Sequence, residues 1–181
     1  MDKNFRTRSL AIIDLETTGL NPTRHEIIEV GMLIVRQPDL EVVEAYEAKI
    51  KPLHIETATS EALEVNGYNE LEWENARNIK EVLQEVADKA ADCIICNHNV
   101  SFDWSFLLEG FTKYNIKHSF DYHMYDIASM IWLKLSDTDL PRLNLNITAQ
   151  FLGIESEPSQ HRALNGATVA YNVLKTLKEL E

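Results

Sequence analysis

Hydrophobic and polar positions follow a strand-like pattern through the first third of the chain. Residues 9–16 (SLAIIDLE) form a short apolar run that ends in acids, residues 26–36 (EIIEVGMLIVR) are rich in β-branched side chains, and residues 41–52 (EVVEAYEAKIKP) alternate. Short apolar or alternating runs of this length are typical of strands. The pattern therefore predicts a three-stranded meander.

Further along, the period of the apolar positions becomes helical, with strands in between. Strands that first pair and then alternate with helices predict an α/β fold, a mixed sheet covered by helices. The rest of the chain is expected to be helical, apart from a connecting loop at 140–144 (LPRLN). The expected elements are a helix over 75–92, a strand over 93–98, a helix over 101–115, a strand over 122–127, and a last helix marked by Ala163, Ala167, Ala170, Leu174 and Leu177.

Length and composition fit one globular unit. The 181 residues are 45% hydrophobic and 25% charged, which is typical of a single domain that spans 1–181. No apolar run approaches the ~20 residues that a membrane helix needs, and the N-terminal region does not resemble a secretory signal. We expect a cytoplasmic protein with no membrane partner.

Two cysteines, Cys93 and Cys96, match a C-x-x-C spacing. They lie in an apolar run with strand character, where side chains three residues apart point to opposite faces. Redox pairs of this spacing need a helix N-terminus instead. We therefore expect reduced, buried packing residues.

The net charge is −12, from 29 acidic against 17 basic residues. Such an excess argues against a broad electrostatic grip on nucleic acid. It leaves room for a nucleic-acid enzyme that binds only a few nucleotides and meets the phosphates through divalent metals. Any contact with nucleic acid should be local.

Candidate chemistry lies where the expected strands end. Asp14 and Glu16 are two residues apart at the end of the first strand, so both side chains project from one face. Such a pair is either solvated or binds a metal. Asp103 falls in the first turn of a helix for which Ser101 is a plausible cap, and an acid there is commonly only a capping device.

Neighbours of Asp103 offer further contacts. His98, Asn99 and Phe102 could hydrogen-bond to and stack against a nucleotide, although His98 could equally be a satisfied core histidine. For Asp126, a helix-capping or scaffold role is favoured over direct chemistry.

The motifs DLETTGL, NHNVSFD and HRAL, in this order, resemble those of the DEDDh-type 3′-to-5′ exonucleases, the family of the bacterial polymerase proofreading subunit. MYDIASM and NITAQFLGI lie between the last two motifs, and the resemblance runs from about Leu10 to Leu177. It implies a ribonuclease H-like fold, a mixed five-stranded sheet flanked by helices. It also implies metal-dependent release of mononucleotides from single-stranded or short DNA or RNA 3′ ends.

The resemblance also implies roles for individual residues. Asp14, Glu16 and Asp103 match the family's first three acidic ligands, His161 matches its general base, and Thr17 and Leu20 fall where the family contacts the terminal nucleotide. Hard oxygen ligands select Mg²⁺ or Mn²⁺, and two such cations are expected as cofactors.

The family's fourth acid stands five positions after the histidine, where this chain has Gly166. Glycine cannot coordinate a cation, so at least one metal site should be weakened. Three interpretations stay open: a variant with reduced activity, a catalytically impaired nucleic-acid-binding subunit of a polymerase or RNA-processing complex, or a substitution introduced to disable the enzyme. Besides an exonuclease and a non-catalytic binding module, a metal-dependent phosphoesterase for small nucleotides is a third class of function.

Overall fold

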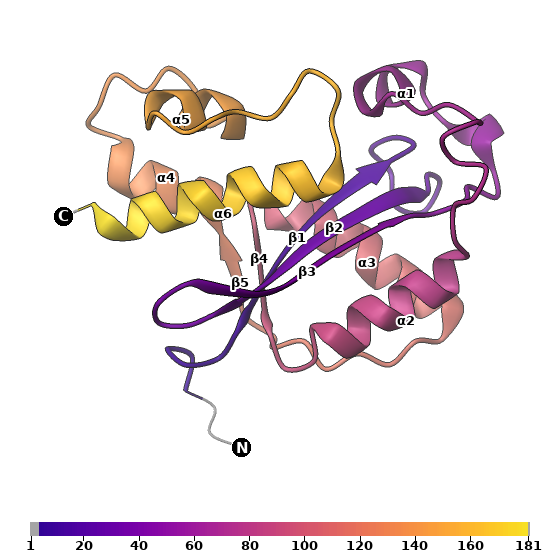
Figure 1. Ribbon diagram of the computed structural model, residues 1–181, viewed down its shortest axis with the longest axis horizontal. Coiled ribbons are helices and arrows are strands. Elements are labelled where there is room, and N and C mark those ends of the chain that lie inside the picture. The colour runs from indigo at the N-terminus through magenta and orange to yellow at the C-terminus, as the bar shows by residue number, and fades with distance from the viewer. Residues whose placement is uncertain (1–3, 181) are drawn as a thin grey trace.

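One five-stranded sheet forms the centre of the computed structural model, which describes residues 4–180 (Figure 1). The strand order is β3-β2-β1-β4-β5. The first three strands pair antiparallel, whereas β4 pairs parallel with β1 and β5 pairs parallel with β4. This confirms the expected mixed sheet and meander. The strands are β1 (Leu10–Thr17), β2 (Ile27–Arg36), β3 (Glu41–Lys49), β4 (Ile94–Asn97) and β5 (Met124–Asp126).

Helices cover both faces of the sheet. Figure 1 shows α6 running across one face with α4 and α5 beside it, and α2 and α3 on the opposite face. The short α1 lies at the end of the sheet to which β1 points. The helices are α1 (Ser60–Asn66), α2 (Ile79–Lys89), α3 (Val100–Tyr114), α4 (Ile127–Leu135), α5 (Leu145–Phe151) and α6 (Ala163–Glu179), with a 3-10 turn at Ile55–Thr57.

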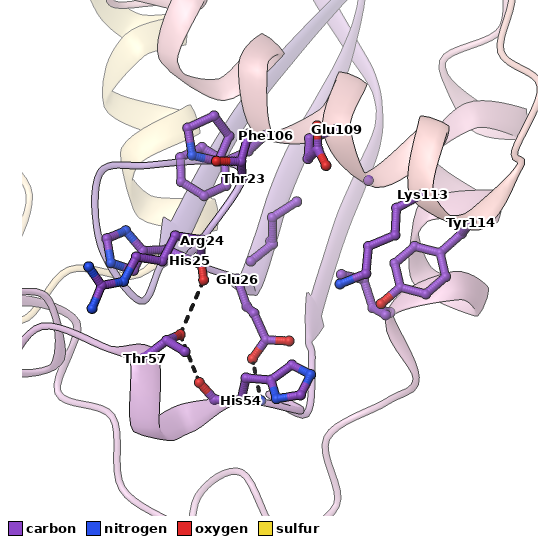
Figure 2. A pocket seen from close by; sticks show the side chains of 14 residues that line it. Thr23, Arg24, His25, Glu26, His54, Thr57, Phe106, Glu109, Lys113 and Tyr114 are labelled. Carbon is purple, nitrogen blue, oxygen red and sulfur yellow. Dashed lines mark hydrogen bonds between the residues drawn. The ribbon is translucent and has the colours of Figure 1, made fainter.

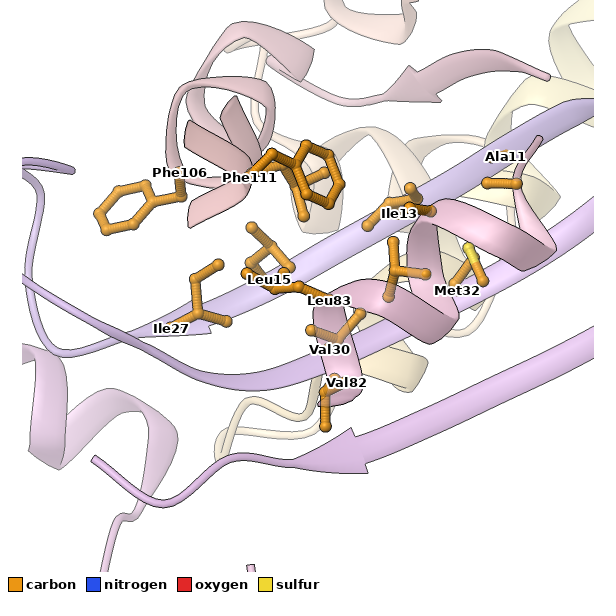
Figure 3. Close-up of a cluster of buried hydrophobic side chains, with 14 of the residues drawn as sticks. Ala11, Ile13, Leu15, Ile27, Val30, Met32, Val82, Leu83, Phe106 and Phe111 are labelled. Atoms are coloured by element: carbon orange, nitrogen blue, oxygen red, sulfur yellow. The ribbon is translucent and has the colours of Figure 1, made fainter. Parts of the chain in front are cut away.

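Alternation along β1 divides its side chains between two cores. Ala11, Ile13 and Leu15 join the core under α2 and α3, part of which is drawn in Figure 3. Leu10 and Ile12 join the core under α6. Since successive side chains of a strand alternate between faces, Asp14 and Glu16 continue the second series and face α6.

Strand β2 brings α6 unusually close to the sheet at Gly31. A Cβ atom added to Gly31 would lie 2.1 Å from the carbonyl carbon of Ala163 and 2.1 Å from the backbone nitrogen of Leu164. Gly31 also pairs with Asp14 across the sheet. The missing side chain therefore lets the first turn of α6 lie directly over the strand pair that carries Asp14.

Three element boundaries differ from the sequence prediction. Helix α2 begins at Ile79 because the Asn78 side chain accepts a hydrogen bond from Lys80 N and caps the helix there. Asn99, with φ of 60°, is the N-cap of α3 in place of Ser101, whose hydroxyl donates to Asn99 Oδ1. Residues 152–162 were expected to be helical but form a loop, because Gly153 ends α5 with φ of 71°.

The two cysteines are free and buried, as expected. Cys93 belongs to the core under α2 and α3, and Cys96 to the core under α6, so they face opposite sides of the sheet. Within residues 4–180, no helix is both long and apolar enough to cross a membrane.

Replacing Gly31 by alanine should destabilise the protein by about 3 kcal/mol, the upper end of overpacking costs, because the new methyl group meets the α6 backbone. Gly110→Ala is the matched control, since the close contact of the Cβ there is with Leu83 Cδ1, the end of a side chain, and not with the backbone of another element. Urea unfolding of both variants measures the difference. Equal stabilities would contradict the close approach of α6.

Candidate active site

A cleft of about 830 Å³ opens where β1 ends. Its walls come from the end of β1, from α1, from the junction of β4 and α3, and from the loop before α6. The fold brings together, from distant positions in the chain, all the site residues that the sequence led us to expect. The expected residues that line the cleft are Asp14, Glu16, Thr17, Leu20, His98, Asn99, Phe102, Asp103, His161 and Gly166.

Asp103 reaches the cleft because β1 and β4 stop pairing early. Their ladder ends at Ile12 and Cys96, and beyond it Leu15 N donates to Asp103 Oδ1 at 3.1 Å. The buried Asp103 side chain thus satisfies a backbone donor that the sheet leaves free. Asp103, in the first turn of α3, is therefore hydrogen-bonded to the end of β1.

Asn97 joins the carboxylates of Asp14 and Asp103. Its Nδ2 donates to Asp14 Oδ1 at 3.1 Å and to Asp103 Oδ2 at 2.9 Å. The expected proximity of these two acids is therefore observed. Asn97 is 1% exposed, so its amide is a buried bridge between the two carboxylates.

Burial makes the negative charge of these acids unfavourable. It raises the pKa of Asp14 to about 7, with the charges of Glu157 and Glu29 adding to the effect against the Asn97 hydrogen bond. Burial also raises the pKa of Glu16 to about 9, with the charge of Asp14 as the next cause. Burial and the charge of Asp14 likewise raise the pKa of Asp103.

The donor set suits divalent cations. Three carboxylates of β1 and α3 share one cleft, and their hard oxygen atoms are the ligands that Mg²⁺ and Mn²⁺ prefer. A cation among them would stabilise their ionised forms against the burial and the repulsion that raise their pKa values. The residues present therefore fit the cofactors that the sequence led us to expect.

His161 stands at the rim, in the loop before α6. Its backbone N donates to Val65 O at 3.1 Å, and its side chain is 39% exposed. His161 Nδ1 lies 3.5 Å from Glu157 Oε2. Ligand atoms of Glu16, Glu157 and His161 all lie within 4.8 Å of one another.

Gly166 lies in the first turns of α6, against Asp14. A Cβ atom there would be 2.4 Å from Asp14 Oδ2. The carboxylate of Asp14 thus occupies the space that a side chain at position 166 would need, and the first turn of α6 carries no acid.

Glu29 ties the start of α6 to the sheet. It is fully buried, pairs with Glu16 across the strands, and accepts a hydrogen bond from Ala163 N at 3.3 Å through Oε1. Burial raises its pKa to about 7, and Arg162, with Nη1 4.0 Å from Oε2, opposes that rise. Arg162 also donates from Nη1 to Asn66 O at 2.6 Å. This cluster fixes the helix that follows His161.

The residues expected to contact the substrate differ in exposure and in whether their polar atoms are already hydrogen-bonded within the protein. The Thr17 hydroxyl donates to Gly19 O at 2.8 Å, whereas Leu20 is 82% exposed at the mouth of the cleft. Burial lowers the pKa of His98, and its Nε2 has no hydrogen-bond partner among the described residues. The Phe102 ring packs 5.1 Å from that of Phe106, while Asn99 N donates to Asp126 Oδ1 at 2.9 Å.

Asp126 has the scaffold role that was favoured. Its side chain caps α4 by accepting from Ala128 N, and it also accepts from the Ser129 hydroxyl at 2.8 Å. Together with the contact to Asn99 N, these bonds join the ends of β5 and β4.

A smaller hollow of about 160 Å³ lies beside the cleft (Figure 2). Hydrogen bonds join some of the residues that line it: Glu26 Oε2 accepts from His54 N at 2.7 Å, and the Thr57 hydroxyl donates to Arg24 O at 3.2 Å. His25 Nδ1 accepts from Asn21 N at 2.9 Å. These contacts fix the loop between β1 and β2, which carries Leu20.

Four side chains at or beside the site were not expected from the sequence: Asn66, Asn97, Glu29 and Glu157. Asn66 Nδ2 donates to Thr17 O at 3.1 Å and joins α1 to β1. Glu29 gave a usable signal, because an acid inside an otherwise apolar strand calls for a buried partner. Glu157 gave none, since its loop has no periodic pattern.

Metal-free protein should lose stability as pH rises from about 4.5 to about 9. Unfolded Glu16 releases its proton at the ordinary value, whereas folded Glu16 keeps it until about pH 9, so ionisation favours unfolding. Glu16→Gln should therefore raise the melting temperature at pH 8 in chelator by at least about 3 °C.

The control is Glu61→Gln, which removes an equal charge from an exposed position on the same cleft. Scanning calorimetry across this pH range measures both variants. If Glu16→Gln melts no higher than Glu61→Gln, ionisation of Glu16 does not destabilise the folded protein.

Known proteins share both the sequence pattern and the fold. The exonuclease family RNase_T matches residues 11–174. A DNA polymerase III PolC-type of Thermotoga petrophila is 37% identical over 106 residues, which are 59% of this chain and 8% of that protein. The 3′-5′ exonuclease DinG of Staphylococcus aureus is 34% identical over 113 residues, 60% of this chain and 12% of that protein.

Among solved structures, Escherichia coli Exonuclease I in complex with a dT13 oligonucleotide superposes with a TM-score of 0.81 at 17% identity, over 96% of this chain and 41% of that one. The chain thus spans a small part of these curated relatives and under half of the solved structure. The fold is shared throughout, and the match to the family covers nearly the whole sequence. This chain belongs to the exonuclease family, and its domain has the ribonuclease H-like fold.

Proposed function

We propose that the chain is a metal-dependent 3′-to-5′ exonuclease that releases mononucleotides from single-stranded or short 3′ ends. The observation that carries this proposal is the meeting of Asp14, Glu16 and Asp103 with His161 in one cleft. These acids come from strand β1 and helix α3, which are distant in sequence. The two elements are joined by the hydrogen bond from Leu15 N to Asp103, residues that are 88 positions apart.

Divalent cations, when bound, lower the pKa of water and neutralise charge on the phosphate. Asp14, Glu16 and Asp103 would hold them. Asn97 keeps Asp14 and Asp103 at a fixed separation through its two hydrogen bonds, so these ligands need little reorganisation when a cation arrives.

His161 has the position of a general base. Its ring is partly exposed at the rim, and its backbone is held by Val65. With Nδ1 directed at Glu157, Nε2 is the ring nitrogen left to accept the proton of an attacking water. The rigid attachment of α6 through Glu29 and Gly31 keeps this loop anchored at its C-terminal end.

Single-stranded DNA is the substrate that we favour. The solved structure cited above holds a dT13 oligonucleotide, and the PolC-type similarity suggests a setting in DNA synthesis or repair, with a polymerase as partner. The exposed Leu20 and the ring of Phe102 offer apolar surface on which terminal bases can stack. RNA, a partner in RNA processing and a cytoplasmic location remain parts of the same hypothesis.

A 5′-labelled single strand incubated with Mg²⁺ or Mn²⁺ should shorten from its 3′ end and release mononucleotides. His161→Ala should slow release about 100-fold, a usual contribution of general-base catalysis, and Asp103→Asn should slow it at least as much. Asp88→Asn, on the exposed face of α2, is the control of equal charge change.

Running the assay on DNA, RNA and free nucleotides distinguishes the substrate classes. Binding of the oligonucleotide without release would favour the impaired nucleic-acid-binding subunit, and release from free nucleotides alone would favour a small-nucleotide phosphoesterase.

The salt dependence of binding should be gentle. Among the described residues that line the cleft there is no Lys or Arg, so few phosphates can be neutralised by the protein itself. With two or fewer phosphate contacts, log K against log salt should have a slope no steeper than about −1.4 for a single strand at fixed Mn²⁺. Fluorescence anisotropy measures this slope, and a steeper one would reveal a basic groove outside the cleft.

A further inference from the structure

Helix α6 cannot supply the fourth carboxylate of the proposed site. Its first turn has no acidic residue, and position 166 is a glycine. The Asp14 carboxylate lies 2.4 Å from where a Cβ of residue 166 would stand, so it fills that space. Any further acid must therefore come from another element.

The loop before α6 brings Glu157 into the cleft. Although this residue lies in an irregular segment, its side chain is only 6% exposed. Glu157 N donates to Asn146 Oδ1 at 3.1 Å, which fastens the residue to α5. Glu157 Oε1 accepts from Arg162 N at 3.1 Å, which folds the loop around the carboxylate.

Glu157 points at the acids of β1. Its carboxylate oxygen lies within 4.8 Å of a Glu16 carboxylate oxygen and of a His161 ring nitrogen. Two oxygen ligands of one Mg²⁺ or Mn²⁺ ion, each roughly 2.1 Å from it, are at most about 4.2 Å apart, so a small inward movement of these side chains would allow them to share a cation. The charge of Glu157 also acts on both Asp14 and Glu16.

A second observation is that buried oxygen atoms beside the site lack hydrogen-bond partners among the described residues. Glu29, beside Glu16 in the sheet and fully buried, has an Oε2 atom with no hydrogen-bond partner among residues 4–180. The nearby guanidinium of Arg162 is engaged by Asn66 O and Glu72 and stays 4.0 Å away. Asn97 Oδ1, in the side chain whose Nδ2 joins Asp14 and Asp103, is likewise buried without a partner.

The hydrogen bond between Arg162 N and the side chain of residue 157 does not require that side chain to be charged. Arg162 N needs only an acceptor, which a neutral amide would supply equally well. A carboxylate buried among other carboxylates costs stability unless a cation accompanies it. The acid at this position therefore calls for a role that depends on its charge.

We propose that Glu157 takes the place of the carboxylate that α6 lacks and, together with Glu16, coordinates one of the divalent cations of the exonuclease site. This inference rests on the proposed function, since it assumes that cations bind in the cleft. The fourth acidic ligand is thereby assigned to residue 157, four positions before His161 in the same loop, instead of to position 166 of helix α6.

Mn²⁺ binding to the full chain tests the assignment independently of turnover. Glu157→Gln keeps an acceptor for Arg162 N but removes the charge, so we expect it to weaken Mn²⁺ binding at least about tenfold by calorimetry. Glu155→Gln, an exposed position of the same loop, should bind as the parent does. Glu157→Asp, which keeps the charge, should recover part of the affinity.

Electron paramagnetic resonance of bound Mn²⁺ and melting temperatures in chelator accompany the titrations, so that an unfolded variant is recognised. If Glu157→Gln is folded and binds Mn²⁺ as Glu155→Gln does, the assignment is overturned, even if its pH-rate profile shifts because His161 is misplaced. If Asp103→Asn loses Mn²⁺ in that same experiment, the proposed function survives. A parent chain that binds no Mn²⁺ overturns both.

Discussion

The burial of several carboxylates at the end of β1, together with their mutual repulsion, is the constraint on which the rest of the site depends. Once Glu16 and Glu157 are both ionised, two unit charges 4.8 Å apart, the upper limit of their separation, repel by about 3 kcal/mol at the effective dielectric constant of a protein interior. The charge of Asp14 likewise acts on Glu16 and Asp103. The fold must hold these groups together against that repulsion, and the cations that the family uses must relieve it.

Most of the holding is done by backbone geometry and neutral side chains. The early end of the ladder between β1 and β4 leaves Leu15 N free for Asp103, and Asn97 spans the gap to Asp14. The absence of a side chain at Gly31 brings α6 down onto β2, where Glu29 receives Ala163 N. Positive charge from the start of α6 then faces the acids without a basic side chain having to enter the cleft.

How much the sequence could predict follows from the range of the interactions. The period of two in β1 placed Asp14 and Glu16 on one face, and the family motifs brought in Asp103 and His161, so the sheet and most of the cleft were predictable. The bridge made by Asn97 was not, because it joins residues 83 positions apart through a ladder that ends early. Nor was the loop at 152–162, since Gly153 stops α5 before its apolar pattern ends.

The source of the fourth carboxylate affects how the site can respond. An acid on α6 would be fixed by the contacts of Gly31 and Glu29, which leave that helix little freedom. Glu157 is held instead by two hydrogen bonds within a loop, at Asn146 and Arg162. Since His161 lies in the same loop, a cation bound by Glu157 would also order the proposed base, so cation binding and alignment of that base would be one event. A glycine at 166 is compatible with an active site under this arrangement, because it gives the Asp14 carboxylate room beside α6 while the charge comes from the loop before that helix.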